Sequence, residues 1–217
     1  MFSETLLDEI NPRHLLKHPF YQAWNEGKLS RECLQSYAKQ YFFHVNAFPR
    51  YVSAVHSLCH DEISRSELAQ NLADEEGLTG TKAHPALWVQ FAKALGVEKK
   101  DLDAAPCKRA TSELSKTFTK NTRSSYAEGL GTLLAYEYQV PEIAETKISG
   151  LKKHFDITSD EGVEFFVVHQ SADVFHSRSL KDAVDRLPPA EQELARKAVH
   201  ETADALWNFL TETYDAA

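Results

Sequence analysis

The sequence predicts an all-α protein, folded as one bundle of about seven helices. Only 8 glycines and 8 prolines interrupt the 217 residues, and long stretches between them repeat apolar residues at the spacing of a helix face. No two neighbouring segments alternate apolar and polar residues as paired strands do. A chain of this length can bury a sizeable core, so we expect a single domain over residues 1–217.

Residues typical of helix ends divide the chain in order. Gly27 ends the first helix and Ser30 caps the second, while Gly96 ends the segment before the middle of the chain. Residues 158–161 have the spacing of a capping box, and the proline pair 188–189 suits the first turn of the last helix. We expect helices at roughly 3–26, 30–58, 62–76, 84–95, 108–120, 124–153, 159–186 and 189–214, which makes eight if the short central segment is independent.

Two prolines fall inside expected helices. Pro49 and Pro141 lack the amide hydrogen that would bond the carbonyl four residues earlier, so each is expected to kink its helix. At Pro141 the carbonyl left free is that of Glu137. A kink there would re-aim the Glu137 side chain, although packing around a crowded core explains such a proline equally well.

Composition narrows the function classes. The formal net charge is -8, with 32 acidic and 24 basic residues and no cluster of Lys or Arg, which argues against nucleic acid or an anionic membrane as the main partner. No apolar run approaches the ~20 residues of a membrane helix, and the first residues contain no apolar signal segment. The three cysteines show no C-x-x-C spacing. A cytoplasmic protein that acts on small molecules fits best.

Three polar residues interrupt an apolar helix near the C-terminus. His169, Asp173 and His176 stand at positions i, i+4 and i+7, which places their side chains within about 60° of one another on one helix face. Burying these groups without partners is costly, and a bound cation would remove that cost. A hydrogen-bonded polar stripe between two helices is the alternative interpretation.

Three further residues could complete a metal site: Glu75, His84 and Glu137. With the triplet they make three imidazoles and three carboxylates, and helical bundles build dinuclear centres from such ligands on facing helices. Three carboxylates and a bridging hydroxide would neutralise two divalent cations. Mixed nitrogen and oxygen ligands favour iron or manganese over zinc. The sequence alone does not show that Glu75 and His84 reach the other four.

An aromatic stripe follows one face of the second expected helix. Core packing explains Phe48 and Val55, but the polar tips of the other members need partners if they are buried. Such a face could hold a small aromatic ligand or carry oxidising equivalents from a metal. The stripe has the helical spacing 4-3-4-3-4 and consists of Tyr37, Tyr41, His44, Phe48, Tyr51 and Val55.

Lys147 lies ten residues beyond Glu137 on the same expected helix. A lysine near a helix C-terminus is usually solvated, where it complements the helix dipole. The alternative is an amine that points inward beside the metal site.

Taken together, these segments resemble the haem-oxygenase-like helical bundles, in particular the chlamydial protein associating with death domains and its bacterial homologues. The matching segments are HPFYQAWNEGKLSRECLQSYAKQYFFHVNAFPRYVSAVHS, NLADEE, His84, LAYEYQVPEIAETKI and HQSADVFH, which span nearly the whole chain. The resemblance implies a seven-helix bundle that is commonly a homodimer. By motif match, the metal ligands fall on Glu75, His84, Glu137, His169, Asp173 and His176.

The same resemblance implies a reaction. These relatives are understood to make 4-aminobenzoate, a folate precursor, with a dinuclear centre of two irons or of iron and manganese that uses O2 and a reductant. They use one of their own tyrosines as the ring source and a lysine as the amino donor. The matching residues are Tyr21 and Lys147, with Tyr37 and Tyr136 as tyrosines near the metals.

Three other functions remain open at this point. The chain could be a conventional di-iron oxidase that acts on a diffusible small substrate. It could instead be a pocket protein like pyrroloquinoline-quinone synthase or thiaminase, which needs no metal. It could also be an interaction module without catalysis, in which case loss of Asp173 would leave its function intact.

Overall fold

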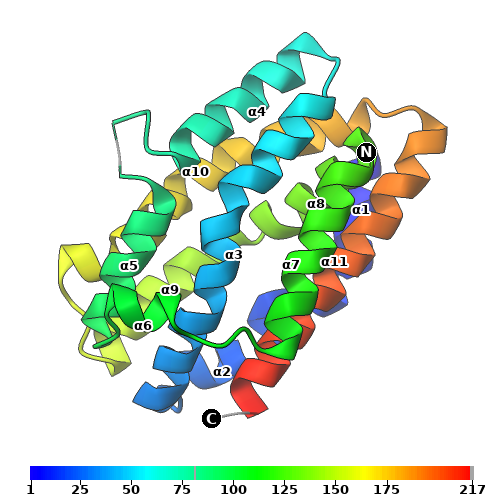
Figure 1. The fold of residues 1–217 in the computed structure, drawn as a ribbon. Helices are drawn as coiled ribbons and strands as arrows, with labels where there is room; N and C mark the ends of the chain where they lie inside the picture. The colour runs from blue at the N-terminus through cyan, green and yellow to red at the C-terminus, as the bar shows by residue number, and fades with distance from the viewer. Residues whose placement is uncertain (81, 216–217) are drawn as a thin grey trace.

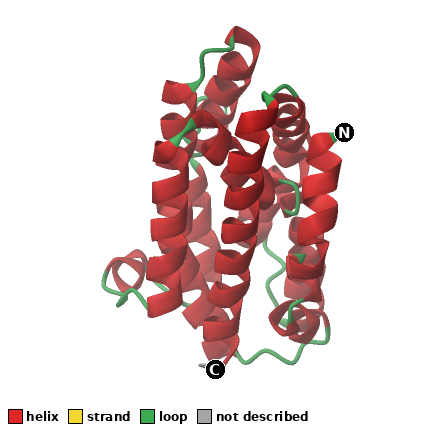
Figure 2. Cartoon of the chain, turned by 90° about the vertical axis from the view of Figure 1, so that its right-hand side faces the viewer, coloured by secondary structure: helices red, strands yellow, loops and turns green. Residues whose placement is uncertain are grey.

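The structure is a computed structural model, and it describes residues 1–80 and 82–215, so residues 81 and 216–217 of the expected domain lie outside it. Within the described part the chain is helical and contains no strand, which confirms the all-α prediction. The long helices run roughly along one direction, with the connections at their ends (Figure 2). The expected number of seven helices is wrong. The described residues form α1 (Phe2–Ile10), η1 (Asn11–Arg13), η2 (Leu15–Lys17), α2 (Pro19–Asn25), α3 (Arg31–Leu58), α4 (Glu62–Glu75), α5 (His84–Ala94), α6 (Lys99–Asp103), α7 (Arg109–Ser124), α8 (Tyr126–Glu137), α9 (Val140–His154), α10 (Asp160–Asp185) and α11 (Pro189–Asp215).

The first expected helix, 3–26, is broken into four short elements. Pro12 and Pro19 each lack an amide hydrogen and occupy the first turn of a new element, η1 and α2 respectively. The side chain of His18 caps α2, because its Nδ1 accepts a hydrogen bond from the amide of Phe20 at 3.0 Å. Two 3₁₀ turns, η1 and η2, connect α1 to α2.

The expected helix 124–153 is also divided, and the interruption is larger than the kink predicted at Pro141. α8 ends at Glu137 and α9 begins at Val140, so Pro141 lies in the first turn of a new helix, where no amide is needed. The side chain of Gln139 bridges the break, since it accepts a hydrogen bond from Leu15 N and donates one to Ala135 O, both at 2.8 Å. Pro49, in contrast, remains inside the continuous helix α3.

Most of the other predicted boundaries are confirmed. Ser30 caps α3 by accepting from the amide of Cys33 at 3.0 Å, and Gly27 after α2 adopts the left-handed φ of +67°. Ser159 caps α10, one residue later than the predicted capping box would place the cap. The short helix α6 was not predicted.

Helix α3 runs through the middle of the bundle, with α4 and α5 on one side and α7, α8 and α11 on the other (Figure 1). Trp88 ties α5 to α3, because its Nε1 donates to Ala38 O at 2.9 Å. The buried residues include polar side chains of two kinds: carboxylates and imidazoles on α4, α5, α8 and α10, and tyrosines on α2, α3 and α8 with one lysine on α9. No helix in the described part of the chain is both long enough and apolar enough to cross a membrane.

Candidate dinuclear metal centre

The six residues matched to metal ligands are buried and lie in two neighbouring groups of three. Within each group, one possible ligand atom from every residue lies within 4.8 Å of the others. Helix α10 contributes to both groups, since its three polar residues share one face as the spacing predicts. The first group consists of Glu75, His84 and His169, and the second group consists of Glu137, Asp173 and His176.

Helix ends position two of the three carboxylates. Glu75 is the last residue of α4 and Glu137 is the last residue of α8. The C-terminus of a helix carries partial negative charge, so a carboxylate there is unfavourable unless a cation is near. Burial raises the pKa of both Glu75 and Glu137 to about 8. A bound cation would therefore stabilise the ionised carboxylate at both positions.

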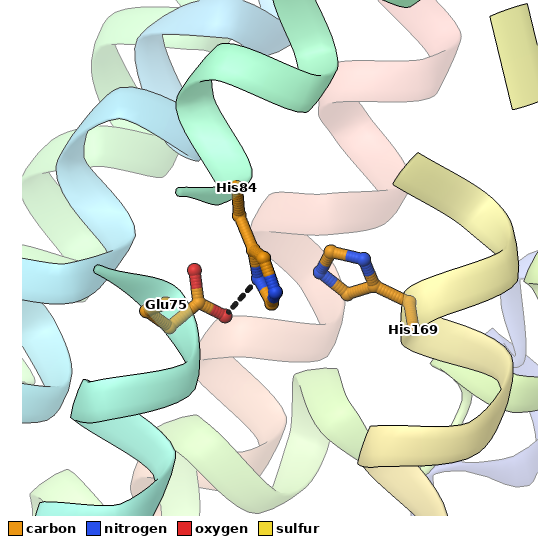
Figure 3. A group of neighbouring side chains, drawn as sticks. All are labelled: Glu75, His84 and His169. Atoms are coloured by element: carbon orange, nitrogen blue, oxygen red, sulfur yellow. Dashed lines mark ion pairs between the residues drawn. The ribbon is translucent and has the colours of Figure 1, made fainter. Parts of the chain in front are cut away.

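The first group faces inward from three helices (Figure 3). His84 Nδ1 lies 2.9 Å from Glu75 Oε1, yet the pair is not aligned as a hydrogen bond, and neither ring nitrogen of His84 has a hydrogen-bond partner. The rings of His84 and His169 are 4.3 Å apart between centroids. His169 Nδ1 bonds the carbonyl oxygen of Phe165 at 2.7 Å, which leaves its Nε2 free to coordinate. Burial lowers the pKa of His84 to about 4, so its ring is neutral at pH 7.

The second group has more hydrogen bonds to neighbouring side chains. His176 Nδ1 lies 3.2 Å from Asp173 Oδ1 and 3.9 Å from Glu137 Oε2, and its Nε2 lies 3.0 Å from Asp74 Oδ2. Asn71 Nδ2 donates to both oxygens of Glu137 at 3.0 and 3.2 Å. Burial would lower the pKa of His176, but the hydrogen bond to Asp173 and the charge of Glu137 outweigh it and raise the pKa to about 9.

These residues fit a pair of divalent cations. Asp173 Oδ2 and both nitrogens of His84 are buried without hydrogen-bond partners, a costly state that ligation would relieve. Two ligands at right angles on one ion, each about 2.1 Å away, lie roughly 3 Å apart. The 2.9 Å and 3.2 Å contacts within the two groups match that spacing. Three imidazoles and three carboxylates are a donor set suited to iron or manganese.

Sequence reasoning missed two residues that support the second group. Asn71 orients Glu137, and Asp74 holds the far nitrogen of His176. Asn71 stands four residues before Glu75 on the same face of α4, which was an available clue. Asp74 is adjacent to Glu75, but neighbours on a helix point apart, so its contact with α10 could not be expected from the sequence.

The four residues matched to catalytic positions line one narrow cavity of ≈ 30 Å³. Its wall includes His169, so the cavity reaches the first group. Two tyrosines of the aromatic stripe, Tyr37 and Tyr41, line the cavity, whereas the third, Tyr51, does not. The wall is formed by Leu15, Tyr21, Tyr37, Tyr41, Tyr136, Val140, Ile143, Ala144, Lys147, Phe165, Phe166, His169, Leu206, Phe209 and Leu210.

Lys147 points inward, contrary to the solvated position that its place in the sequence favoured. It is 4% exposed, and its Nζ donates a hydrogen bond to the hydroxyl of Tyr37. The rings of Tyr37, Tyr41 and Tyr21 lie 4.8, 5.3 and 5.6 Å from Nζ. Burial lowers the pKa of Lys147 to about 7, so much of the amine is uncharged at neutral pH.

The sequence matches a known protein family. The model of a family described as iron-containing redox enzyme matches residues 35–208. The chain belongs to this family, and it is an oxidoreductase with the haem-oxygenase-like fold.

Three proteins with similar sequences illustrate the relationship. A 4-aminobenzoate synthase from Chlamydia pneumoniae is 40% identical over 210 residues, which cover 96% of this chain and 92% of that protein. Another, from Nitrosomonas europaea, is 42% identical over 221 residues and covers 96% of this chain and 89% of its own. A pyrroloquinoline-quinone synthase from Pseudomonas aeruginosa is 25% identical over 217 residues, with 96% and 84% covered.

A solved structure agrees on the fold. A TenA homologue from Pseudomonas syringae pv. tomato superposes with a TM-score of 0.84 at 18% sequence identity, over 99% of this chain and 93% of that one. At that identity the likeness shows the fold alone.

Proposed function

We propose that this protein is an O2-activating oxygenase with a dinuclear metal centre, and that it makes 4-aminobenzoate from its own side chains. Tyr21 is the source of the ring and Lys147 is the donor of the amino group. Iron occupies at least one metal position, with iron or manganese in the other, and a reductant supplies electrons. The relatives named 4-aminobenzoate synthase support the product, and the homodimer stays a prediction.

The observation that carries the proposal is a buried, largely uncharged amine among tyrosines in a cavity too small for a diffusible aromatic substrate. A cavity of ≈ 30 Å³ holds one or two water-sized molecules, whereas a protein cavity that binds benzene measures roughly 150 Å³. O2 fits the space. The only rings that reach it within the described structure are those of the wall itself.

The side chains have matched roles. The six candidate ligands would hold two ions, and two reduced ions bound there would supply the electrons that activate O2. The aromatic wall excludes water, which protects oxidised tyrosines from side reactions. Lys147 Nζ, held by Tyr37 and 5.6 Å from the centre of the Tyr21 ring, is close enough for proximity to replace a second substrate.

Intact mass spectrometry of the iron-loaded protein, before and after exposure to O2 with a reductant, tests the proposal. We expect at most one 4-aminobenzoate per chain, with mass lost at Tyr21 and at Lys147. Tyr21→Phe should load metal normally but release no product. Tyr51→Phe is the matched control, because Tyr51 is also a buried tyrosine but lies outside the cavity wall.

Other outcomes favour the alternatives. Many turnovers with Tyr21 intact would indicate a conventional oxidase with a diffusible substrate. An active protein purified free of metal would indicate a pocket enzyme of the pyrroloquinoline-quinone synthase kind. Normal product from Tyr21→Phe would rule out the self-sacrificing mechanism.

A further inference from the structure

We propose that Tyr41 is the relay residue that takes the oxidation from Tyr136, beside the metal groups, and places it on the ring stacked against Tyr37, the hydrogen-bond partner of the Lys147 amine. The inference rests on the proposed function and adds a residue to it. The aromatic stripe of α3 supplies two neighbouring tyrosines, and the structure gives them different partners. Tyr41 faces Tyr136 on α8, whereas Tyr37 faces Lys147 on α9.

The first contact is a direct hydrogen bond. Tyr41 Oη donates to Tyr136 Oη at 2.9 Å, and both side chains are buried. Tyr41 and Tyr136 line the same cavity wall as the candidate ligand His169. Both tyrosines therefore lie beside the first metal group.

The second contact is ring stacking. The rings of Tyr37 and Tyr41 lie 5.3 Å apart between centroids with an interplanar angle of 20°, as residues four apart on a helix can. Tyr37 in turn accepts the hydrogen bond from Lys147. One continuous set of contacts thus runs from α8 through Tyr41 to the amine.

Other routes from Tyr136 meet residues that are harder to oxidise. In the described part of the chain its aromatic ring contacts are His44, Phe48 and Phe118, with centroids 4.9, 4.9 and 6.1 Å away. A phenol gives up a hydrogen atom far more readily than a benzene ring or a neutral imidazole. Tyr41 is thus the oxidisable neighbour that Tyr136 touches.

The step balances as a hydrogen-atom transfer. Tyr136 first loses one electron and its phenolic proton, which leaves a neutral Tyr136 radical; two metal ions held by the candidate ligands would, with O2, supply the oxidant. The O–H bond of Tyr41 then breaks, and its proton and one electron pass along the 2.9 Å hydrogen bond to re-form the O–H bond of Tyr136. The unpaired electron now lies on the ring that stacks against Tyr37. No charge crosses the low-dielectric interior, since electron and proton move together.

Tyr41→Phe tests the relay, because it removes the hydroxyl while keeping the ring and its stacking. We expect the variant to bind the same amount of metal as the native protein. Its yield of 4-aminobenzoate per chain should fall by about a hundredfold, the scale of a misplaced reacting group. Freeze-quench electron paramagnetic resonance with ring-deuterated tyrosine should show a tyrosine radical that persists at Tyr136 and disappears in Tyr41→Phe/Tyr136→Phe. Tyr51→Phe should retain native yield and radical decay.

The result distinguishes the relay from the function on which it rests. Native yield and native radical decay in Tyr41→Phe would overturn the relay, whatever Tyr21→Phe shows. Normal product from Tyr21→Phe would overturn the self-sacrificing function, while a long-lived Tyr136 radical confined to Tyr41→Phe would still support the relay.

Discussion

The first group of candidate ligands receives few hydrogen bonds from neighbouring side chains, whereas the second group receives several. His84 has no hydrogen-bond partner at either nitrogen. His176, in contrast, lies between Asp173 and Asp74, and Asn71 bonds both oxygens of Glu137. The two groups therefore face different problems when no ion is present.

The second group can neutralise itself by holding a proton, since the pKa of His176 is raised to about 9 once the carboxylates outweigh burial. The first group can hold a proton only on Glu75, whose pKa burial raises to about 8, because burial lowers the pKa of both its imidazoles. An ion in the first group displaces one proton and relieves unpartnered ligands, whereas an ion in the second group must displace two protons. The two groups have similar ligands, but we expect the pH dependence of metal binding to differ between them.

Removal of a ligand should give the largest effect. His84→Ala is expected to lose the ion of the first group only, and Asp173→Ala the ion of the second group only, so each retains one metal per chain. Product yield should fall at least about a hundredfold in both, because loss of a ligand exceeds the usual cost of losing an outer partner. Metal analysis after dialysis measures the stoichiometry. Two metals retained in either variant would contradict the assignment of that residue.

The outer partners should matter for the second group alone. Asp74→Asn and Asn71→Ala are each expected to weaken one of the two metal sites by about 10–100-fold. Competition with a chelator measures the affinity of each site, provided that the two ions are distinguished by absorption at two wavelengths or by isotopic labelling. Glu76→Gln is the matched control, because Glu76 is exposed on the same segment as Asp74. A loss spread equally over both sites would contradict the division into two groups.

Metal affinity should fall as pH falls from 8 to 6, with a different slope in each group. Burial raises the pKa of Glu75 to about 8, so the first group must release one proton to bind metal. The second group must release two, from Glu137 and from His176, whose pKa values are about 8 and about 9. Each displaced proton costs about tenfold in affinity per pH unit below those values. Calorimetry in buffers of different ionisation enthalpy counts the protons, and equal counts would refute the comparison.

The smallest expected effect is on stability, and it compares His84 with His44, a second buried histidine whose ring nitrogens both lack hydrogen-bond partners. His44 is packed among aromatic rings, and burial lowers its pKa to about 3. His44→Phe should stabilise the protein by about 1 kcal/mol with or without metal, since it removes unpaired polar atoms. His84→Phe should stabilise the metal-free protein only. Urea unfolding with and without iron measures both, and destabilisation by His44→Phe would show that an unseen partner exists.

The sequence was a good guide where a single residue type decides the outcome. The cap at Ser30 and the i, i+4, i+7 face of α10 follow from local rules that tertiary packing did not override. Lys147 was harder, because its burial depends on helices far away in the sequence, and a helix-end lysine is usually solvated. Pro141 predicted only a kink, whereas the helix is divided at residues 138–139 and the break is bridged by a tertiary contact, Gln139 to Leu15, that no local pattern contains.

The contact between Gln139 and Leu15 has one more consequence. It fastens the segment just ahead of α2, the helix that carries Tyr21, to the turn that directly follows the candidate ligand Glu137. If Tyr21 is consumed, we expect the repacking of α2 to reach Glu137 through this contact. A spent chain should then bind an ion in the second group less tightly than a fresh chain.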